Sequence, residues 1–286
     1  MSLVQVRALG RGSLGPVWLC ASPAPPTASN SASASPASPS HVVQKQVSLT
    51  RVSLFDSVLP LRELRLASAV SHANLVEYRA IDATATELRI LMEYSPLGSL
   101  VSAGTAVDPV EITKSLLLAL HATHRYKMLH RNIKPSNILV FPGGVVKLAD
   151  LGMSRANTVF GSASSSLPQW QFMAPEILAL EDDSEDFVED FYLRFTPEAD
   201  IWSLGAALYA SFSGGALPYK TKGELKNSES PPPRGEGITP AAWKLILNML
   251  SRNTDTRRAF LTEVVADGLV GAGGAKKETP RLEALR

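Results

Sequence analysis

A glycine-rich segment near the start of the sequence has the residue types needed to bind phosphate. Gly10, Gly12, Gly15 and Val17 match the pattern G-x-G-x-x-G-x-V. Glycine has no Cβ, so backbone amides in such a turn can approach phosphate oxygens closely. The same spacing fits an ordinary β-hairpin, so this pattern alone leaves both interpretations open. A dinucleotide-binding turn is disfavoured because the segment continues into a strand-like stretch instead of opening a helix.

Charged and amide side chains follow in an order that would suit the handling of a polyphosphate. Lys45 ends the strand-like stretch Val42-Val43-Gln44-Lys45, and Glu63 follows eighteen residues later in an expected helix. Taken singly, Lys45 and Glu63 would more often form an exposed ion pair. Two further segments lie downstream, His130-Arg131-Asn132-Ile133-Lys134-Pro135-Ser136-Asn137 and, thirteen residues later, Asp150-Leu151-Gly152. An isolated Asp-Leu-Gly would be a turn, so only the joint order argues for chemistry.

In this order and spacing the motifs resemble the eukaryotic protein kinase family, over residues 3–262. Lys134, two residues after Asn132, is typical of the serine/threonine kinases. The stretches at 72–76 and 98–100 are similar to the sterile-kinase and mitogen-activated kinase-kinase-kinase groups. The resemblance also rests on Leu91-Met92-Glu93-Tyr94, Ala174-Pro175-Glu176, Asp200-Ile201-Trp202-Ser203-Leu204-Gly205 and Arg257.

The resemblance implies ATP and Mg²⁺ as cofactors, because transfer of a γ-phosphoryl group requires a polyanion to be held and its charge spread. Lys45 would contact the α and β phosphates and be steadied by Glu63. Asn137 and Asp150 would hold the metal ions, which prefer oxygen ligands. Lys134 would neutralise charge on the moving phosphoryl group.

The resemblance also implies an adenine-binding hinge and a structural ion pair. The backbone from Glu93 to Ser95 would bind adenine, with Met92 in the gatekeeper position. Glu176 and Arg257 would form a buried ion pair. Arg131 would bind a phosphorylated activation loop, for which Thr158, Ser162 and Ser164 are candidate sites, although an unmodified serine-rich loop is an equal alternative.

The sequence departs from the family at the position of the catalytic aspartate, which is Asn132. An amide can accept a hydrogen bond but cannot take up a proton. A general base contributes about 10²–10⁴-fold to a rate, and in the family this change usually marks a pseudokinase. A second departure precedes Ala174, where either Gln169 or Leu167 replaces the threonine that normally bonds the catalytic aspartate and lysine.

Two functions therefore remain open. The preferred one is an ATP-binding, catalytically impaired kinase-like regulator or scaffold, and the alternative is an active serine/threonine kinase of low turnover. Ala174-Pro175-Glu176 and Arg257 argue against a small-molecule phosphotransferase, because those residues belong to the peptide-docking part of the family. A scaffold without nucleotide would require a vestigial glycine turn. The sequence leaves the protein substrate or partner and the oligomeric state open.

The elements expected around these residues indicate an α+β, bilobal fold. Strands at 3–9, 16–20, 41–49, 75–81 and 87–94 and one regulatory helix at 58–70 form an amino-terminal lobe, 3–94. A helical lobe at 95–262 follows, with a hairpin near 138–148. Eighteen of the twenty residues from Ala21 to Ser40 are Ala, Ser or Pro, which favours a disordered insertion. Residues 263–286 are expected to form a flexible tail.

Composition excludes several classes of function. The chain has 28 Lys and Arg against 27 Asp and Glu, so no strong field for nucleic acid or an anionic membrane is expected. The longest apolar runs are too short for membrane insertion. No secretory signal is visible, and the single Cys20 excludes an internal disulfide and fits a reducing compartment, so we expect a cytoplasmic protein.

Overall fold

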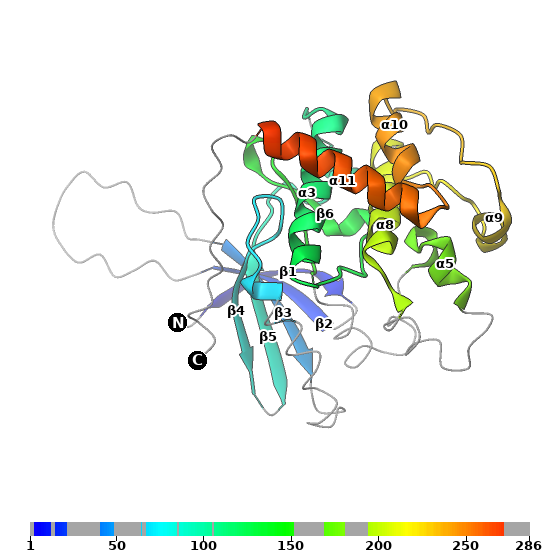
Figure 1. The fold of residues 1–286 in the computed structure, drawn as a ribbon. Helices are drawn as coiled ribbons and strands as arrows, with labels where there is room; N and C mark the ends of the chain where they lie inside the picture. The colour runs from blue at the N-terminus through cyan, green and yellow to red at the C-terminus, as the bar shows by residue number, and fades with distance from the viewer. Residues whose placement is uncertain are drawn as a thin grey trace.

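The amino-terminal lobe is a five-stranded antiparallel sheet. In the computed structural model the strands are β1 (Val4–Gly12), β2 (Gly15–Ala21), β3 (His41–Ser48), β4 (Tyr78–Ala83) and β5 (Glu87–Glu93), in the order β1-β2-β3-β5-β4. Figure 1 shows this sheet at one end of the molecule and the helices at the other. The structure describes residues 3–12, 15–21, 41–48, 64, 67–84, 86–104, 106–151, 169–180 and 194–271.

Alternating side chains build the inner face of this sheet. Leu88, Ile90 and Met92 are buried on β5 while the residues between them are more exposed, because successive side chains of a strand point to opposite faces. The strand expected at 75–81 begins later, at Tyr78. Leu75 and Val76 instead lie against Leu148 of the other lobe, and the Val76 amide donates to the Leu148 carbonyl at 2.8 Å.

The second lobe consists mainly of helices. Its helices are α2 (Leu100–Ala103), α3 (Pro109–Arg125), α5 (Pro175–Leu178), α8 (Pro197–Phe212), α9 (Lys222–Asn227), α10 (Pro240–Met249) and α11 (Thr254–Gly271). Short 3₁₀ turns span Pro135–Asn137, Pro142–Gly144 and Trp170–Phe172. The expected hairpin is confirmed as β6 (Ile138–Val140) paired with β7 (Val146–Leu148). The predicted α+β fold, with a small antiparallel lobe and a helical lobe, is likewise confirmed.

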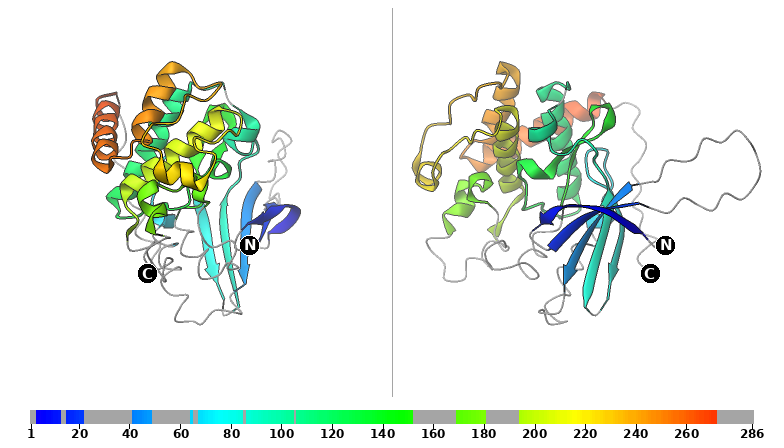
Figure 2. Two further views of the ribbon diagram at one scale, coloured as in Figure 1. Left: turned by 90° about the vertical axis from the view of Figure 1, so that its right-hand side faces the viewer. Right: turned by 180° about the vertical axis from the view of Figure 1, so that it is seen from behind.

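Helix starts in this lobe follow local sequence signals. Three helices begin with proline directly after a capping residue, and the side chains of Asp108, Thr196 and Thr239 accept from amides in the first turn. Proline suits this position because its missing amide would have no partner there. Helix α8 lies at the centre, with Trp202 and Leu204 fully buried, and α11 crosses α3 and α8 (Figures 1 and 2).

The last helix extends further along the chain than the sequence analysis predicted. The tail was expected from residue 263, whereas α11 continues to Gly271. Phe260, Leu261 and Val264 are buried in the helical core, which holds this segment against α3. Gly268 packs closely on α3, since a Cβ there would lie 3.1 Å from the Leu118 side chain.

Several predictions fall on parts of the chain outside the described residues. These include nearly all of the 21–40 insertion, Glu63, the candidate phosphorylation sites Thr158, Ser162 and Ser164, and Leu167. Of the helix expected at 58–70, the structure describes Leu64 and residues 67–69 as helical. Among the described helices, none combines the length and apolar character needed to cross a bilayer.

Candidate active site

The centre of the candidate site is a contact between the two lobes. Lys45 lies on β3, opposite Val17 of β2 and Ile90 of β5. Its Nζ forms an ion pair with Oδ1 of Asp150, and about one sixth of each side chain is exposed (16% and 18%). Burial by itself raises the pKa of Asp150, but the charge and hydrogen bond of Lys45, with smaller contributions that include Lys134, outweigh it, so the pKa lies below its usual value. The carboxylate is therefore held ionised beside a cation.

The β6–β7 hairpin places Asn137 beside the Asp150 segment. Ile138 pairs with Leu148 across the hairpin, and the next residues continue this approach, with the Ala149 amide donating to the Asn137 carbonyl at 2.8 Å. Asp150 follows with φ of +67°, a left-handed conformation that non-glycine residues rarely adopt. The two predicted metal ligands therefore come from neighbouring backbone segments.

These two residues offer donor atoms that suit Mg²⁺. The Asn137 Nδ2 donates to the Asn132 carbonyl at 2.8 Å, so the amide oxygen is the atom that Asn137 can offer to a metal. Asp150 adds a carboxylate, and both are hard oxygen donors. Within the described part of the chain there is no cluster of three or more His, Cys, Asp or Glu side chains that could hold a metal alone.

A buried carboxylate anchors the loop that carries Asn132 and Lys134. Asp200, on α8, accepts from the backbone amides of His130 and Arg131 at 2.8 Å each, and from Nε2 of His124 at 3.0 Å. Burial raises the pKa of Asp200, but its interactions with His124 and the hydrogen bond from the Arg131 amide contribute to outweighing it, so the net pKa is lowered. Asp200 was recognised in the sequence as part of a motif, whereas nothing in the spacing marked His124.

The hollow beside this loop brings Asn132 and Gln169 together. Asn132, Lys134 and Gln169 line it, with Phe172, Met173 and Phe195 among the apolar residues around them. Of the two positions left open by the sequence, Gln169 is the one found here, and Leu167 lies outside the described residues. The polar lining therefore includes the two amide side chains and the Lys134 ammonium, together with Arg131 and Ser203.

The glycine turn is the tip of the β1–β2 hairpin. Gly12 pairs with Gly15, and the residues between them are not described. Gly10 and Gly15 have φ of +150° and +145°. A Cβ on Gly15 would lie 2.3 Å from the backbone oxygen of Gln46, so this glycine is required by the approach of β3. Val17, two residues further along β2, pairs with Lys45 of β3.

The predicted hinge joins the two lobes through its side chains. Glu93 Oε1 accepts from Lys147 Nζ at 2.6 Å and from the Glu77 amide at 2.8 Å. Ser95 is buried, and its hydroxyl donates to the Val140 carbonyl. These side chains are bonded within the protein, and the Glu93 amide donates to the Glu77 carbonyl at 3.0 Å. Adenine binding by the backbone of Glu93 to Ser95 stays a prediction.

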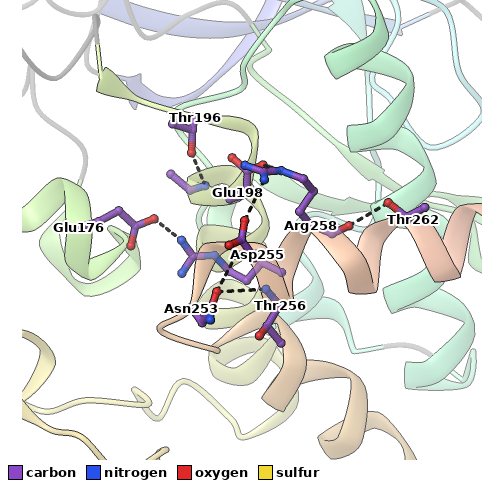
Figure 3. Close-up of polar contacts among 10 residues, drawn as sticks. Glu176, Thr196, Glu198, Asn253, Asp255, Thr256, Arg258 and Thr262 are labelled. Carbon is purple, nitrogen blue, oxygen red and sulfur yellow. Dashed lines mark hydrogen bonds and ion pairs between the residues drawn. The ribbon is translucent and has the colours of Figure 1, made fainter.

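A buried arginine connects α11 to α5 in the helical lobe. Arg257 is fully buried and forms an ion pair with Glu176, while its Nη1 donates to the Ser251 carbonyl at 2.9 Å. Beside this pair, Nε of Arg258 contacts Oε1 of Glu198 at 2.7 Å, and Figure 3 shows these two side chains and the Glu176 carboxylate. The expected pair between Glu176 and Arg257 is therefore present, but it is buried only on the arginine side, since 31% of the Glu176 side chain is exposed.

A tyrosine that the sequence interpretation overlooked also reaches the site. The Tyr78 hydroxyl donates to the Leu151 carbonyl at 2.6 Å, directly after Asp150. Burial and, secondly, the Asp150 charge raise the pKa of Tyr78 well above its ordinary value. The sequence placed Tyr78 in the strand expected at 75–81 and carried no signal for this contact.

Comparison with known proteins agrees with this architecture. The protein kinase domain family matches residues 3–267, and the chain belongs to this family. Its relatives are of the serine/threonine type. Protein kinases in general use ATP and Mg²⁺.

The relatives of this chain include mitogen-activated protein kinase kinase kinases. It is 36% identical over 51% of its length to kinase kinase kinase 1a of Physcomitrium patens, covering 19% of that protein. It is 32% identical over 68% of its length to kinase kinase kinase 3 of Arabidopsis thaliana, covering 30% of that protein. With kinase kinase kinase 4 of Mus musculus it shares 30% identity over 53% of its length, covering 10% of that protein. The chain thus spans less than a third of each of these relatives.

Proposed function

We propose that this domain binds ATP with Mg²⁺ between its lobes and acts in the cytoplasm as a catalytically impaired, kinase-like signalling regulator or scaffold. The observation that carries the proposal is the direct contact of Lys45 with Asp150, in a site whose neighbouring loop has Asn132 at the position of the base. A cation and a carboxylate at the lobe junction are what triphosphate and metal binding require.

Nucleotide binding would use groups that are already close together. Lys45 would exchange part of its contact with Asp150 for phosphate oxygens, and Asp150 and Asn137 would turn oxygen atoms to the metal. Bound Mg²⁺ would supply charge neutralisation for the phosphates. Lys134 borders the small hollow beside Asn132, and its ammonium would neutralise charge on a transferred phosphoryl group.

Impairment follows from the side chains of that hollow. Asn132 can orient an incoming hydroxyl through its amide oxygen, but it cannot accept the proton. Gln169 likewise offers an amide in place of the family's threonine. The domain would therefore bind partners more effectively than it turns over substrate, and the names of its relatives suggest partners from a mitogen-activated protein kinase cascade.

The alternative is a serine/threonine kinase of low turnover. It is favoured by the presence of Lys45, Lys134, Asn137 and Asp150, because positioning and metal electrostatics dominate phosphoryl transfer. Such an enzyme would transfer the γ-phosphate of ATP to a protein serine or threonine.

Nucleotide binding is tested by thermal unfolding with ATP and Mg²⁺. Ligand at about 100 times its Kd should add roughly 2.7 kcal/mol to the free energy of unfolding. Asp150→Ala should lose the magnesium-dependent part of this shift. Lys45→Met should lose most of the whole shift. No shift of the wild-type protein at millimolar ATP would contradict nucleotide binding.

Catalysis is tested by transfer of labelled phosphate to the protein itself or to a generic protein substrate. The wild-type protein should be near background, and Asn132→Asp should gain about 10²–10⁴-fold. The double variant Asn132→Asp, Asp150→Ala is the matched control and should return to background. Robust wild-type transfer that Asp150→Ala abolishes would establish the alternative instead.

A further inference from the structure

The Tyr78 hydroxyl forms a long-range bond to the backbone beside Asp150. Tyr78 begins β4 in the amino-terminal lobe, and its hydroxyl donates to the Leu151 carbonyl at 2.6 Å. The two residues are 73 positions apart in the sequence. The bond therefore ties the sheet lobe to the Asp150-Leu151 segment independently of Lys45.

The segment around Asp150 is held at three consecutive residues. The Ala149 amide donates to the Asn137 carbonyl, the Asp150 carboxylate pairs with Lys45, and Leu151 accepts from Tyr78. Asp150 needs such restraint because its left-handed backbone, φ +67°, persists only where the surroundings fix it. Nucleotide and metal would engage the Asp150 and Asn137 side chains and Lys45, whereas the Tyr78 bond would remain unchanged.

The Tyr78 ring is itself firmly placed. It packs against both hydrophobic clusters, the one beneath the sheet that contains Leu88 and Ile90 and the one in the helical lobe that contains Leu75 and Leu151. A ring held on two sides leaves its hydroxyl little freedom, so the direction of the bond to Leu151 is well defined. Tyr78 is thus placed to support the backbone of Leu151, the residue that directly follows Asp150.

We propose that Tyr78 is a positioning residue for Asp150. Its hydroxyl fixes the Leu151 carbonyl and so keeps the preceding carboxylate aimed at the site where metal-bound phosphate would sit. The metal-binding consequence rests on the proposed function, whereas the restraint of the Asp150 backbone does not. Groups that orient a metal ligand commonly change metal affinity by about 10–100-fold when removed.

The first test needs no ligand. Tyr78→Phe removes the hydroxyl and keeps the ring, and Tyr209→Phe is the matched control, since the Tyr209 hydroxyl donates to the Pro233 carbonyl at 3.1 Å elsewhere in the helical lobe. Hydrogen–deuterium exchange of peptides covering residues 146–151 should be roughly fivefold faster in Tyr78→Phe. It should be unchanged in Tyr209→Phe. Equal exchange in the two variants would overturn the proposal.

The second test measures the magnesium requirement of nucleotide binding. At fixed ATP, the Mg²⁺ concentration for half of the thermal shift should rise about tenfold in Tyr78→Phe and remain unchanged in Tyr209→Phe. An unchanged requirement in Tyr78→Phe would refute the metal-positioning role even if exchange were faster. If the wild-type protein gives no shift with ATP and Mg²⁺, nucleotide binding fails, and the exchange comparison still decides whether Tyr78 restrains the segment.

Discussion

At the level of single residues, the fully buried guanidinium of Arg257 has Glu176 as its directly bonded carboxylate. Glu176 supplies the opposite charge, and the Ser251 carbonyl accepts one further bond at 2.9 Å. Burial lowers the pKa of Arg257, which reflects the cost of keeping a cation away from water. Loss of Glu176 would leave that charge with only the weaker attraction of the Glu198 carboxylate.

Glu176→Ala should therefore lower the free energy of unfolding by about 3 kcal/mol, because it leaves a buried cation unpaired. The control is Glu87→Ala, which breaks the pair between Glu87 and the half-exposed Arg89 and should cost less than about 1 kcal/mol. Urea unfolding of both variants measures the difference. Similar losses of unfolding free energy in the two variants would show that the Glu176 pair stabilises the fold no more than an exposed ion pair does.

At the level of elements, the β1–β2 hairpin and β3 approach each other at Gly15. Its φ of +145° and the 2.3 Å distance from a built Cβ to the Gln46 oxygen leave no room for a side chain. Gln46 directly follows Lys45, so a shift of β3 at Gln46 would also displace Lys45 from its ion pair with Asp150. Gly15 is therefore needed for the packing of β2 against β3, in addition to any role in phosphate binding.

Gly15→Ala should destabilise the domain by about 1–3 kcal/mol and weaken ATP binding. Gly223→Ala is the control, a glycine-to-alanine change that should not destabilise the domain. Gly223 lies within α9 with open space around its Cα, so alanine should be neutral or add about 0.5–1 kcal/mol through its higher helix propensity. Denaturant midpoints compare the two, and a tolerated alanine at position 15 would contradict the close approach of β3.

At the level of the whole molecule, buried titratable groups near the lobe junction should set the response to acid. Burial lowers the pKa of His130, so the folded protein keeps it neutral. In Asp150 and Asp200 burial raises the pKa, but nearby positive groups and hydrogen bonds outweigh it, so both values are lowered. All three groups take up protons more readily in the unfolded chain.

Stability should therefore fall in two stages as the pH is lowered. The His130 contribution is complete above about pH 6.5 and is lost below it, because the unfolded histidine binds a proton first. The two aspartates add a loss below about pH 4, as the pH falls toward their folded-state values. Urea midpoints between pH 8 and pH 3 measure this, and constant stability from pH 7 to pH 5 would contradict the first stage.

Local chemistry in the chain was sufficient to predict the architecture and the order of the motifs. Strand-like segments in the first third and helical patterns in the remainder predicted the two lobes, and the order and spacing of Lys45, Asn132, Asn137 and Asp150 carried the resemblance to the kinase family. They also predicted the pairing of Glu176 with Arg257 through the family resemblance.

Other features depend on contacts between distant segments. The position of Gln169 beside Asn132, the bonds of His124 to Asp200 and Tyr78 to Leu151, and the extension of α11 to Gly271 became visible in the folded chain. A single hydroxyl meeting a carbonyl 73 residues away leaves no periodic or compositional trace. Such bonds depend on how the lobes pack, and packing is a property of the assembled core.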